Sequence, residues 1–415
     1  MSRRQRWKPV SGFASRVYEP WERWLLRALD LPTLVRRRTF QQAVTAPPID
    51  PTSVRRALVL RLDRMGDLLM SLPALASLRA ALPHARLTLA VGEWCAQIAR
   101  RAPVDEVVVW SAPWVGRRAE GADSLLTLGR RAWALRAQGL DLALDLQGDV
   151  RAALLMTLTG ARARVGYANA GGGWLLTHVV PLDERVSWVE QNHRAVVRAV
   201  GEVAGAREMP LLTERDRGFA SALLKERFGD HRPLVGLHAS GGRLVKQWDL
   251  ACWARVASGL AQTFGAKIVL TGSAADRPLT GALASGLGEN AIDFAGALDV
   301  DEMLAVVGAV DLFLSSDTGP MHMACALGTP SVSLFGPSDP ARYFSGGSGV
   351  SGSRHVVVQA DLWCSPCNLI RRPPRECQGA EPPECLRRIS AEEVLGRASE
   401  LLRAAGYAPI LPHRR

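Results

Sequence analysis

The chain has 415 residues, 47% of them hydrophobic, and a formal net charge of +11. This length exceeds one ordinary hydrophobic core, so two domains are expected, and the apolar fraction excludes a disordered protein. No apolar run approaches the roughly 18 residues of a membrane-spanning helix, and no apolar signal core follows the basic start, so we expect a cytoplasmic protein. The charge predicts an anionic partner, either a nucleotide, a phosphorylated substrate or a membrane surface. No nucleic-acid-binding signature is present, and we expect no nucleic acid partner.

Residues 1–50 form a basic extension with ten Arg or Lys against four Asp or Glu. Its apolar positions repeat at helical spacing and are followed by Arg36, Arg37 and Arg38, which predicts an amphipathic helix. The apolar positions are Trp21, Trp24, Leu25, Ala28 and Leu29. Such a helix suits the interface of the cytoplasmic membrane. The alternatives are a helix packed on the domain surface and an unstructured basic tail.

Residues 51–210 alternate between apolar runs and helical patterns, which predicts a Rossmann-like domain around a parallel sheet. A strand at 57–62 leads into the turn 63–67, and a helix is expected at 68–82. Because the turn carries neither G-x-G-x-x-G nor G-K-[ST], it is neither a dinucleotide fingerprint nor a P-loop. A later strand at 141–146 ends at Gln147, and residues 165–167 are interpreted as a loop.

A second Rossmann-like domain is expected at 211–390. A strand at 234–238 runs into a loop in which Ser240, Gly241 and Gly242 can offer backbone N–H groups to an oxyanion. A strand at 267–270 leads to a loop that contains Asp276. Residues 299–301 spell D-x-D, a metal-binding motif, but we expect them to cap the helix at 302–307.

The most informative stretch is 310–340, where two apolar runs flank a helix at 321–327. Residues 315–318 can cap the helix start, and Gly319 lets the backbone approach a ligand closely. A helix N-terminus just past a strand offers free N–H groups and a positive dipole end, and His322 on the first turn can face the same ligand. The stretch is therefore either a phosphate or diphosphate site or an ordinary strand–helix–strand unit with a capped helix.

Four of the seven cysteines crowd into one Pro- and Arg-rich segment. They are Cys364, Cys367, Cys377 and Cys385. The first pair has the spacing of a zinc site and the second does not. A structural metal cluster, free thiols and disulfides all remain open, although disulfides are unusual in the cytoplasm.

Three motifs together resemble a known family. The run S-S-D-T-G-P-M-H-M-A-C-A-L-G-T-P at 315–330, followed by L-F-G-P-S at 334–338, closely resembles the signature of glycosyltransferase family 9, the ADP-heptose:lipopolysaccharide heptosyltransferases. The turn at 61–75 resembles the family's first loop, [KR]-x4-G-D-x-[LIV]-x3-P-[AV]-L. Residues 238–248 resemble the family loop H-x-[SG]-x5-K-x-W.

The resemblance implies a GT-B fold, an α/β architecture of two Rossmann-like domains facing across a cleft. The N-terminal domain would take the acceptor and the C-terminal domain the sugar nucleotide, and a last helix, within 391–415, would cross back to the first domain. The implied reaction is inverting transfer of a sugar, heptose from ADP-heptose, to a lipopolysaccharide core or related glycan acceptor. Because of the basic extension, we expect the protein either in the cytoplasm or peripherally on the inner face of the cytoplasmic membrane. The resemblance implies no required cofactor or metal.

The resemblance also implies roles for particular residues. Asp67 would be the general base. Without the resemblance, the residues indicate only a carboxylate at a helix N-terminus. Lys246 would approach the diphosphate as the second catalytic residue. The remaining donor site would contain Ser240, Gly241, Asp276, Asp317, Thr318, Gly319 and His322. Acceptor binding is assigned to Arg61, Arg64 and Gln147. The competing functions are a sugar-nucleotide epimerase of similar shape and a non-enzymatic nucleotide-binding protein.

Overall fold

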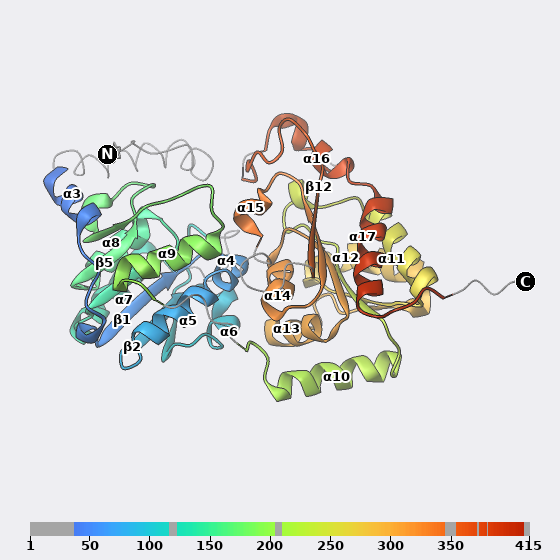
Figure 1. The fold of residues 1–415 in the computed structure, drawn as a ribbon, viewed down its shortest axis with the longest axis horizontal. Coiled ribbons are helices and arrows are strands. Elements are labelled where there is room, and N and C mark those ends of the chain that lie inside the picture. Colours follow the sequence, from blue (N-terminus) through green and yellow to red (C-terminus); the bar gives the residue numbers. More distant parts are fainter. Residues whose placement is uncertain are drawn as a thin grey trace, which may run out of the picture. The chain divides into compact units, whose positions relative to one another are not determined.

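The structure, a computed structural model, describes residues 37–115, 123–203, 210–344, 354–371, 373–379 and 381–410. The chain divides into two compact units, Met1–Met209 and Pro210–Arg415, here called unit 1 and unit 2 (Figure 1). This division falls one residue before the boundary expected between 210 and 211. The amphipathic stripe predicted at 21–29 lies outside the described residues.

Unit 1 is built on a six-stranded parallel sheet with the order β3-β2-β1-β4-β5-β6. Its strands are β1 (Arg56–Arg61), β2 (Arg86–Val91), β3 (Glu106–Val109), β4 (Leu142–Asp145), β5 (Ala163–Tyr167) and β6 (His178–Val180). From β1 to β3 the strands are added on one side of β1, and from β4 to β6 on the other side, so the strand order reverses between β1 and β4. Residues 165–167, expected as a loop, are instead the end of β5, where Val165 pairs with both neighbouring strands.

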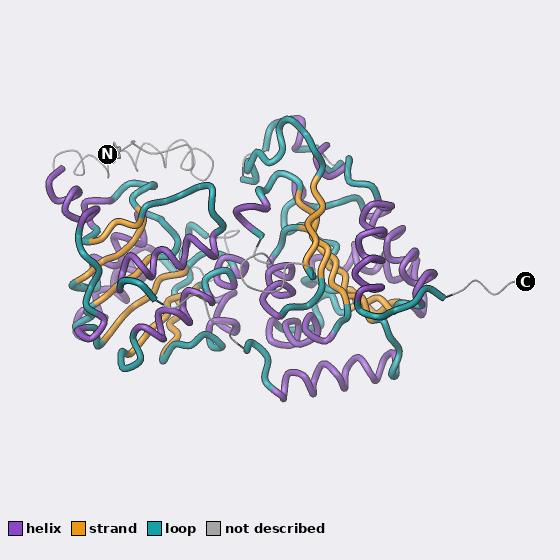
Figure 2. The backbone as a smooth tube through the Cα atoms, in the orientation of Figure 1, coloured by secondary structure: helices purple, strands orange, loops and turns teal. Residues whose placement is uncertain are grey.

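Helices cover both faces of this sheet, as Figure 2 shows. They are α3 (Arg37–Thr45), α4 (Met65–Leu69), α5 (Leu72–Ala81), α6 (Ala96–Ala99), α7 (Leu125–Ala134), α8 (Val150–Leu158) and α9 (Trp188–Val200). Helix α5 packs on α9, and α7 packs on α8. The single helix expected at 68–82 is two helices, because Pro73 has no N–H to continue the hydrogen-bond ladder.

Unit 2 repeats the architecture with the order β12-β11-β10-β7-β8-β9, again all parallel. Its strands are β7 (Leu234–His238), β8 (Lys267–Leu270), β9 (Ala291–Asp293), β10 (Leu312–Ser316), β11 (Ser331–Phe335) and β12 (His355–Gln359). The reversal here lies between β7 and β10. The central strands are apolar and buried because helices cover both faces of the sheet.

The described helices of unit 2 are α10 (Glu214–Phe228), α11 (Leu250–Phe264), α12 (Arg277–Leu287), α13 (Val300–Ala309), α14 (Gly319–Leu327), α15 (Pro340–Tyr343), α16 (Glu384–Arg387) and α17 (Ala391–Ala404). The longer helices pack in two groups. Helix α11 contacts α12 and α17, while α13 contacts α10 and α14. Asp299 accepts a hydrogen bond from the Glu302 N–H at 2.9 Å, so the D-x-D sequence caps α13 as predicted.

The last helix was expected to return to the first domain, and this expectation is corrected. Helix α17 lies within unit 2, where Val394, Ala398 and Leu402 are fully buried in the core that α11 also lines. The apolar stripe of α17 therefore packs on the core of unit 2. Among the described residues, no helix combines the length and the apolarity that crossing a bilayer would require.

Candidate active site

The candidate site residues gather at the carboxyl edge of each sheet, beside the point where the strand order reverses. In unit 1 this edge carries the turn after β1 and the loop after β4. In unit 2 it carries the loops after β7 and β10. Open parallel sheets bind ligands at such reversal points, because the loops on either side diverge and leave a crevice.

Arg61, the last residue of β1, organises the edge of unit 1. Its side chain is only 2% exposed, and its Nε lies 3.1 Å from Asp63 Oδ1 while its Nη2 lies 3.7 Å from Asp67 Oδ1. The guanidinium also donates to the Asp67 carbonyl at 3.1 Å and to the Leu146 carbonyl after β4. Arg61 thus holds the turn after β1 against the loop after β4, and it fixes the position of Asp67.

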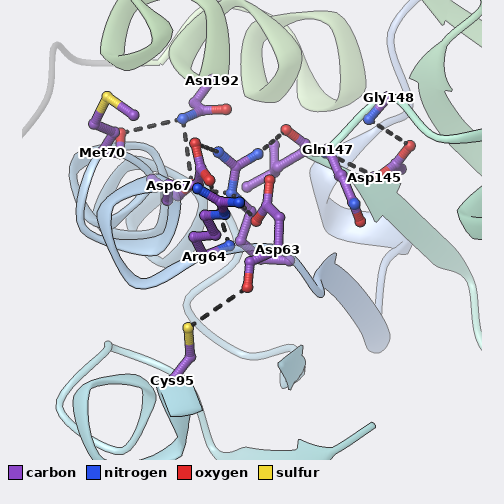
Figure 3. A network of polar contacts seen from close by, with 12 residues as sticks. Asp63, Arg64, Asp67, Met70, Cys95, Asp145, Gln147, Gly148 and Asn192 are labelled. Atoms are coloured by element: carbon purple, nitrogen blue, oxygen red, sulfur yellow. Dashed lines mark hydrogen bonds and ion pairs between the residues drawn. The ribbon is translucent and has the colours of Figure 1, made fainter. Parts of the chain in front are cut away.

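Asp67 sits on the first turn of α4, where a helix N-terminus stabilises a carboxylate. Its Oδ2 accepts a hydrogen bond from the Arg64 N–H at 3.3 Å, and its side chain is 25% exposed. Figure 3 shows Asp63, Arg64 and Asp67 together, with Asp145 at the end of β4 and Gln147 in the loop after it beside them. The carboxylate is therefore both held in place and accessible, as a general base must be.

The end of β4 adds a buried carboxylate, Asp145. Its two oxygens accept the Gln147 N–H at 2.9 Å and the Gly148 N–H at 3.0 Å, and Gly148 has a φ of 81° that favours glycine. Burial raises the pKa of Asp145 to about 7. The Gln147 Oε1 atom is buried and has no hydrogen-bond partner among the described residues. Such an atom is normally satisfied by water or a ligand.

The sequence motifs do not identify three residues of this network, which are Asp63, Asp145 and Asn192. Burial, with the charges of Asp67 and Asp145, raises the pKa of Asp63 well above its usual value against the opposing charge of Arg61. Asn192 of α9 donates to the Met70 carbonyl at 3.1 Å, and so fixes the junction after α4. Asp63 and Asp145 each follow or end an apolar strand, which is a signal that could have found them. Asn192 carries no such local signal.

The elevated pKa of Asp145 predicts a pH dependence of stability. Between about pH 4 and pH 7 the unfolded chain has released this proton while the folded chain retains it. Rising pH therefore lowers the free energy of unfolding, by at most about 1.4 kcal/mol per pH unit for one proton. We expect urea unfolding of D145N at several pH values to show a shallower decline than the wild type. Parallel pH profiles would contradict the assignment.

Unit 2 brings Lys246 and Asp317 together at its own sheet edge. Lys246 ends the short 3-10 helix Leu244–Lys246 after β7, and its ammonium pairs with the Asp317 carboxylate after β10. The side chains are 14% and 7% exposed. Burial acts to raise the pKa of Asp317, but the charges of Lys246 and His322 hold it below its usual value. Two predicted donor-site residues from distant parts of the chain are thus neighbours.

Helix α14 begins at this point. Thr318 is its N-cap residue, Gly319 its first residue, and His322 lies buried on its first turn. Ser315 and Ser316 do not cap the helix, which corrects that expectation, because both continue β10. Their hydroxyls are buried and have no hydrogen-bond partner among the described residues. The buried Ser338 hydroxyl, in the loop after β11, lies beside the Asp317 carboxylate and helps to lower its pKa.

In the loop after β7, the backbone at Gly241 lies very close to the backbone at Gln247. A Cβ atom on Gly241 would lie 2.4 Å from the Gln247 nitrogen, so this position requires glycine. Ser240 lies beside it and is 7% exposed. His238 precedes the loop, and its Nδ1 lies 3.1 Å from Thr271 Oγ1. Burial lowers the pKa of His238 to about 4, so its imidazole is neutral at pH 7.

Asp276 stands after β8, at the start of α12. Its Oδ2 accepts hydrogen bonds from the Ser273 N–H and hydroxyl, both at 2.7 Å. Burial is the largest single influence on the pKa of Asp276 and acts to raise it, but hydrogen bonds from Ser273 and Ser240 together with the charge of His238 outweigh it and lower the pKa. The carboxylate is therefore ionised, and it is hydrogen-bonded to Ser240 in the loop after β7. Its predicted contact with the donor ribose stays a prediction.

The four clustered cysteines follow β12 in unit 2, and all are free thiols. Burial and the charges of Cys367, Cys377 and Cys364 raise the pKa of Cys385 to about 11. The thiols are thus near enough to influence one another. Across the ranges the structure describes, however, no three His, Cys, Asp or Glu side chains are gathered closely enough to hold a metal ion.

Known sequences and structures resemble the chain over most of its length. It is 28% identical to lipopolysaccharide heptosyltransferase 1 of Pseudomonas aeruginosa, covering 84% of this chain and 98% of that protein. It is 26% identical to lipopolysaccharide heptosyltransferase 2 of Escherichia coli K12, covering 69% and 84%. The solved structure of E. coli ADP-heptose lps heptosyltransferase II matches with a TM-score of 0.67 at 21% identity, covering 85% and 99%.

A second solved structure, glycosyl transferase family 9 from Veillonella parvula, also matches with a TM-score of 0.67, at 22% identity, covering 84% of this chain and 97% of that one. These likenesses and the two parallel sheets confirm the predicted GT-B fold class. The sequence profile of glycosyltransferase family 9 (heptosyltransferase) matches residues 128–374, more than half of the chain. The protein therefore belongs to glycosyltransferase family 9 and is a glycosyltransferase.

Proposed function

We propose that this enzyme transfers heptose from ADP-heptose, with inversion, to a lipopolysaccharide core acceptor. The relatives described above are named as lipopolysaccharide heptosyltransferases, which supports the sugar and the acceptor. The observation that carries the proposal is the pairing of Lys246 with Asp317 beside the N-terminus of α14. A cation and a helix N-terminus at the reversal point of a sheet suit a diphosphate.

Unit 2 would bind the sugar nucleotide. The leaving diphosphate gains negative charge as the glycosidic bond breaks, and fixed donors stabilise that charge. Lys246, the N–H groups at Thr318 and Gly319, and His322 supply such donors. In this proposal Ser240 and Gly241 line the same crevice, and Asp276 meets the ribose. Lysine and the helix dipole would take the place of a divalent metal ion, so no metal is required.

Unit 1 would bind the acceptor. A sugar hydroxyl is a weak nucleophile, and Asp67 would remove its proton as it attacks the anomeric carbon. Arg61 keeps Asp67 in place through its ion pair and its bond to the Asp67 carbonyl. The exposed Arg64 and the unpartnered Gln147 Oε1 are the groups available for acceptor hydroxyls and phosphates.

The direct test combines the protein with ADP-heptose and a lipopolysaccharide acceptor that lacks heptose. We expect ADP release with a matching gain in acceptor mass, both unchanged by EDTA. Thermal shifts with ADP-, UDP-, GDP- and TDP-sugars identify the nucleotide, because a bound ligand raises the melting temperature. Conversion of the donor without any acceptor would indicate an epimerase, and binding without turnover would indicate a nucleotide-binding protein.

We further propose that the enzyme works at the inner face of the cytoplasmic membrane, with residues 1–40 contributing to its attachment. Deleting residues 1–36, which leaves α3 and the packing of Phe40 on the core intact, should lower sedimentation with anionic vesicles and leave the melting temperature unchanged. Basic residues near a charged surface each add about 1 kcal/mol, and salt screens this attraction over roughly 8–10 Å, so high salt should mimic the deletion. Aggregation of the shortened protein, or equal pelleting of both proteins, would instead indicate a packed helix or a free tail.

We also propose that Cys364, Cys367, Cys377 and Cys385 form a structural zinc site. Thiolates are preferred zinc ligands, and these four cysteines are free thiols within one segment after β12. Binding of the metal would have to draw them closer together than they lie in the structure. We expect about one zinc per chain in purified protein. The double variant C364S/C367S should lose the metal and melt at lower temperature, whereas C252S, which changes a cysteine elsewhere in unit 2, should keep it. A metal-free wild type with reactive thiols would contradict the site.

A further inference from the structure

Helix α7 of unit 1 carries an apolar face that the fold does not use. Leu128 and Ala132 point inward and are fully buried. Leu125, Leu126 and Trp133 are nevertheless 64%, 75% and 58% exposed. Eight large apolar side chains are exposed among the described residues, and these three of them lie within nine positions of one helix. A surface helix of this kind normally carries polar residues opposite its buried stripe, so the exposed face needs a separate explanation.

The face is also basic. Residues 124–138 contain three arginines and no Asp or Glu. Arg131 forms an ion pair within unit 1, with Asp123 at 2.7 Å. Arg130 lies four residues after Leu126 and is exposed on the same side of the helix. The Arg136 guanidinium lies 4.7 Å from the centre of the Trp133 ring. We name the set Leu125, Leu126, Arg130, Trp133 and Arg136 the α7 face. Apolar side chains among unopposed arginines complement an anionic bilayer surface.

The α7 face begins at the edge of unit 1 that carries the candidate site. Strands β1, β3 and β4 are parallel, so their carboxyl ends share one edge. The start of α7 is tied to the end of β3, because the Asp123 N–H donates to the Ser111 carbonyl at 2.8 Å and the Ser111 N–H donates to the Asp123 carboxylate at 2.9 Å. Leu125 and Leu126 therefore lie toward the edge where Asp67 and Asp145 lie.

From this arrangement we infer that the α7 face is a docking surface for an anionic phospholipid bilayer. Leu125, Leu126 and Trp133 enter the interface between headgroups and acyl chains, and Arg130 and Arg136 meet lipid phosphates. The inference rests on the proposed function, in which unit 1 receives a glycolipid acceptor. Docking through this face places the acceptor edge of unit 1 at the surface in which the lipid part of that acceptor is embedded.

A tryptophan-quenching experiment on the full chain tests where contact occurs. Vesicles of phosphatidylglycerol with brominated phosphatidylcholine quench only tryptophans that enter the bilayer. W133F keeps an apolar ring at the position but removes the reporter, so we expect the quenched fraction of the fluorescence to fall. W363F is the matched control, because Trp363 is 97% exposed in unit 2 and should contribute nothing. Equal quenching in W133F and the wild type overturns the inference.

Sedimentation of the triple variant L125S/L126S/W133S with the same lipids tests the energetics. Because three apolar side chains leave the interface, we expect binding to fall roughly ten-fold or more. W363S should bind as the wild type does. Binding of the triple variant equal to wild type, or a wild type that ignores vesicles because the face binds another protein, overturns the inference.

Transfer to a water-soluble acceptor fragment separates this inference from the proposed function. The triple variant should retain wild-type turnover with that fragment and lose activity only with acceptor in vesicles. If neither protein transfers sugar while the vesicle results hold, the proposed function fails and the docking surface stands. Turnover lost on the fragment with vesicle binding unchanged counts against the docking surface.

Discussion

D67N is expected to lower the turnover number about 100-fold or more, which is typical of the loss of a general base. Asparagine keeps the size of the side chain at the start of α4, but its amide cannot accept the acceptor proton. Donor affinity should stay within a factor of about two, because Asp67 belongs to unit 1 and Lys246 to unit 2. The measurement is the rate of ADP release together with a donor titration of the variant.

A control for D67N is available in the same unit. Asp50 is another helix-capping carboxylate, which accepts the Thr52 N–H at 2.9 Å on the surface, and D50N should leave turnover unchanged. If Asp67 were only a helix N-terminal carboxylate, its loss would cost about 0.3–1 kcal/mol of stability and spare the rate. A collapse of donor affinity with high residual turnover would also reject the role of general base.

K246A should weaken donor binding and turnover together, by roughly 10- to 100-fold, because hydrogen bonds to charged groups contribute about 1.5–3 kcal/mol. The ammonium would face the diphosphate in both the ground state and the transition state, so the Michaelis constant rises as the rate falls. The loss should be much smaller for adenosine, which carries no phosphate. Isothermal titration with ADP and with adenosine measures the two losses directly.

The structure adds a complication that a control can remove. Lys246 neutralises the buried Asp317 carboxylate, and an unpaired buried charge is destabilising. K246A should therefore also melt at lower temperature, and K246A/D317N should recover stability without recovering ADP affinity. K267A changes a lysine that begins β8 at the opposite edge of the same sheet, and it should bind ADP normally. Unchanged ADP affinity in K246A would remove this lysine from the donor site.

Local patterns in the sequence determine several features of this protein. Alternating apolar and helical segments predict two parallel α/β sheets, since strand and helix formation depend on nearby residues. The turn at 61–67 and the run at 315–330 are contiguous in sequence, so their motifs by themselves indicate a carboxylate at the start of α4 and a helix N-terminus after β10. The D-x-D sequence is recognisable as a cap for the same reason.

Other features were decided only by the tertiary structure. The order of strands brings the loop after β7 beside that after β10, and only then does Lys246 meet Asp317. The same holds for Asn192, which reaches the junction after α4 from a helix far along the chain. Strand order and the partner of a helix face depend on contacts between distant segments, which no local pattern contains. For that reason the packing of α17 within unit 2 and the exposed face of α7 could not be foreseen from their sequences alone.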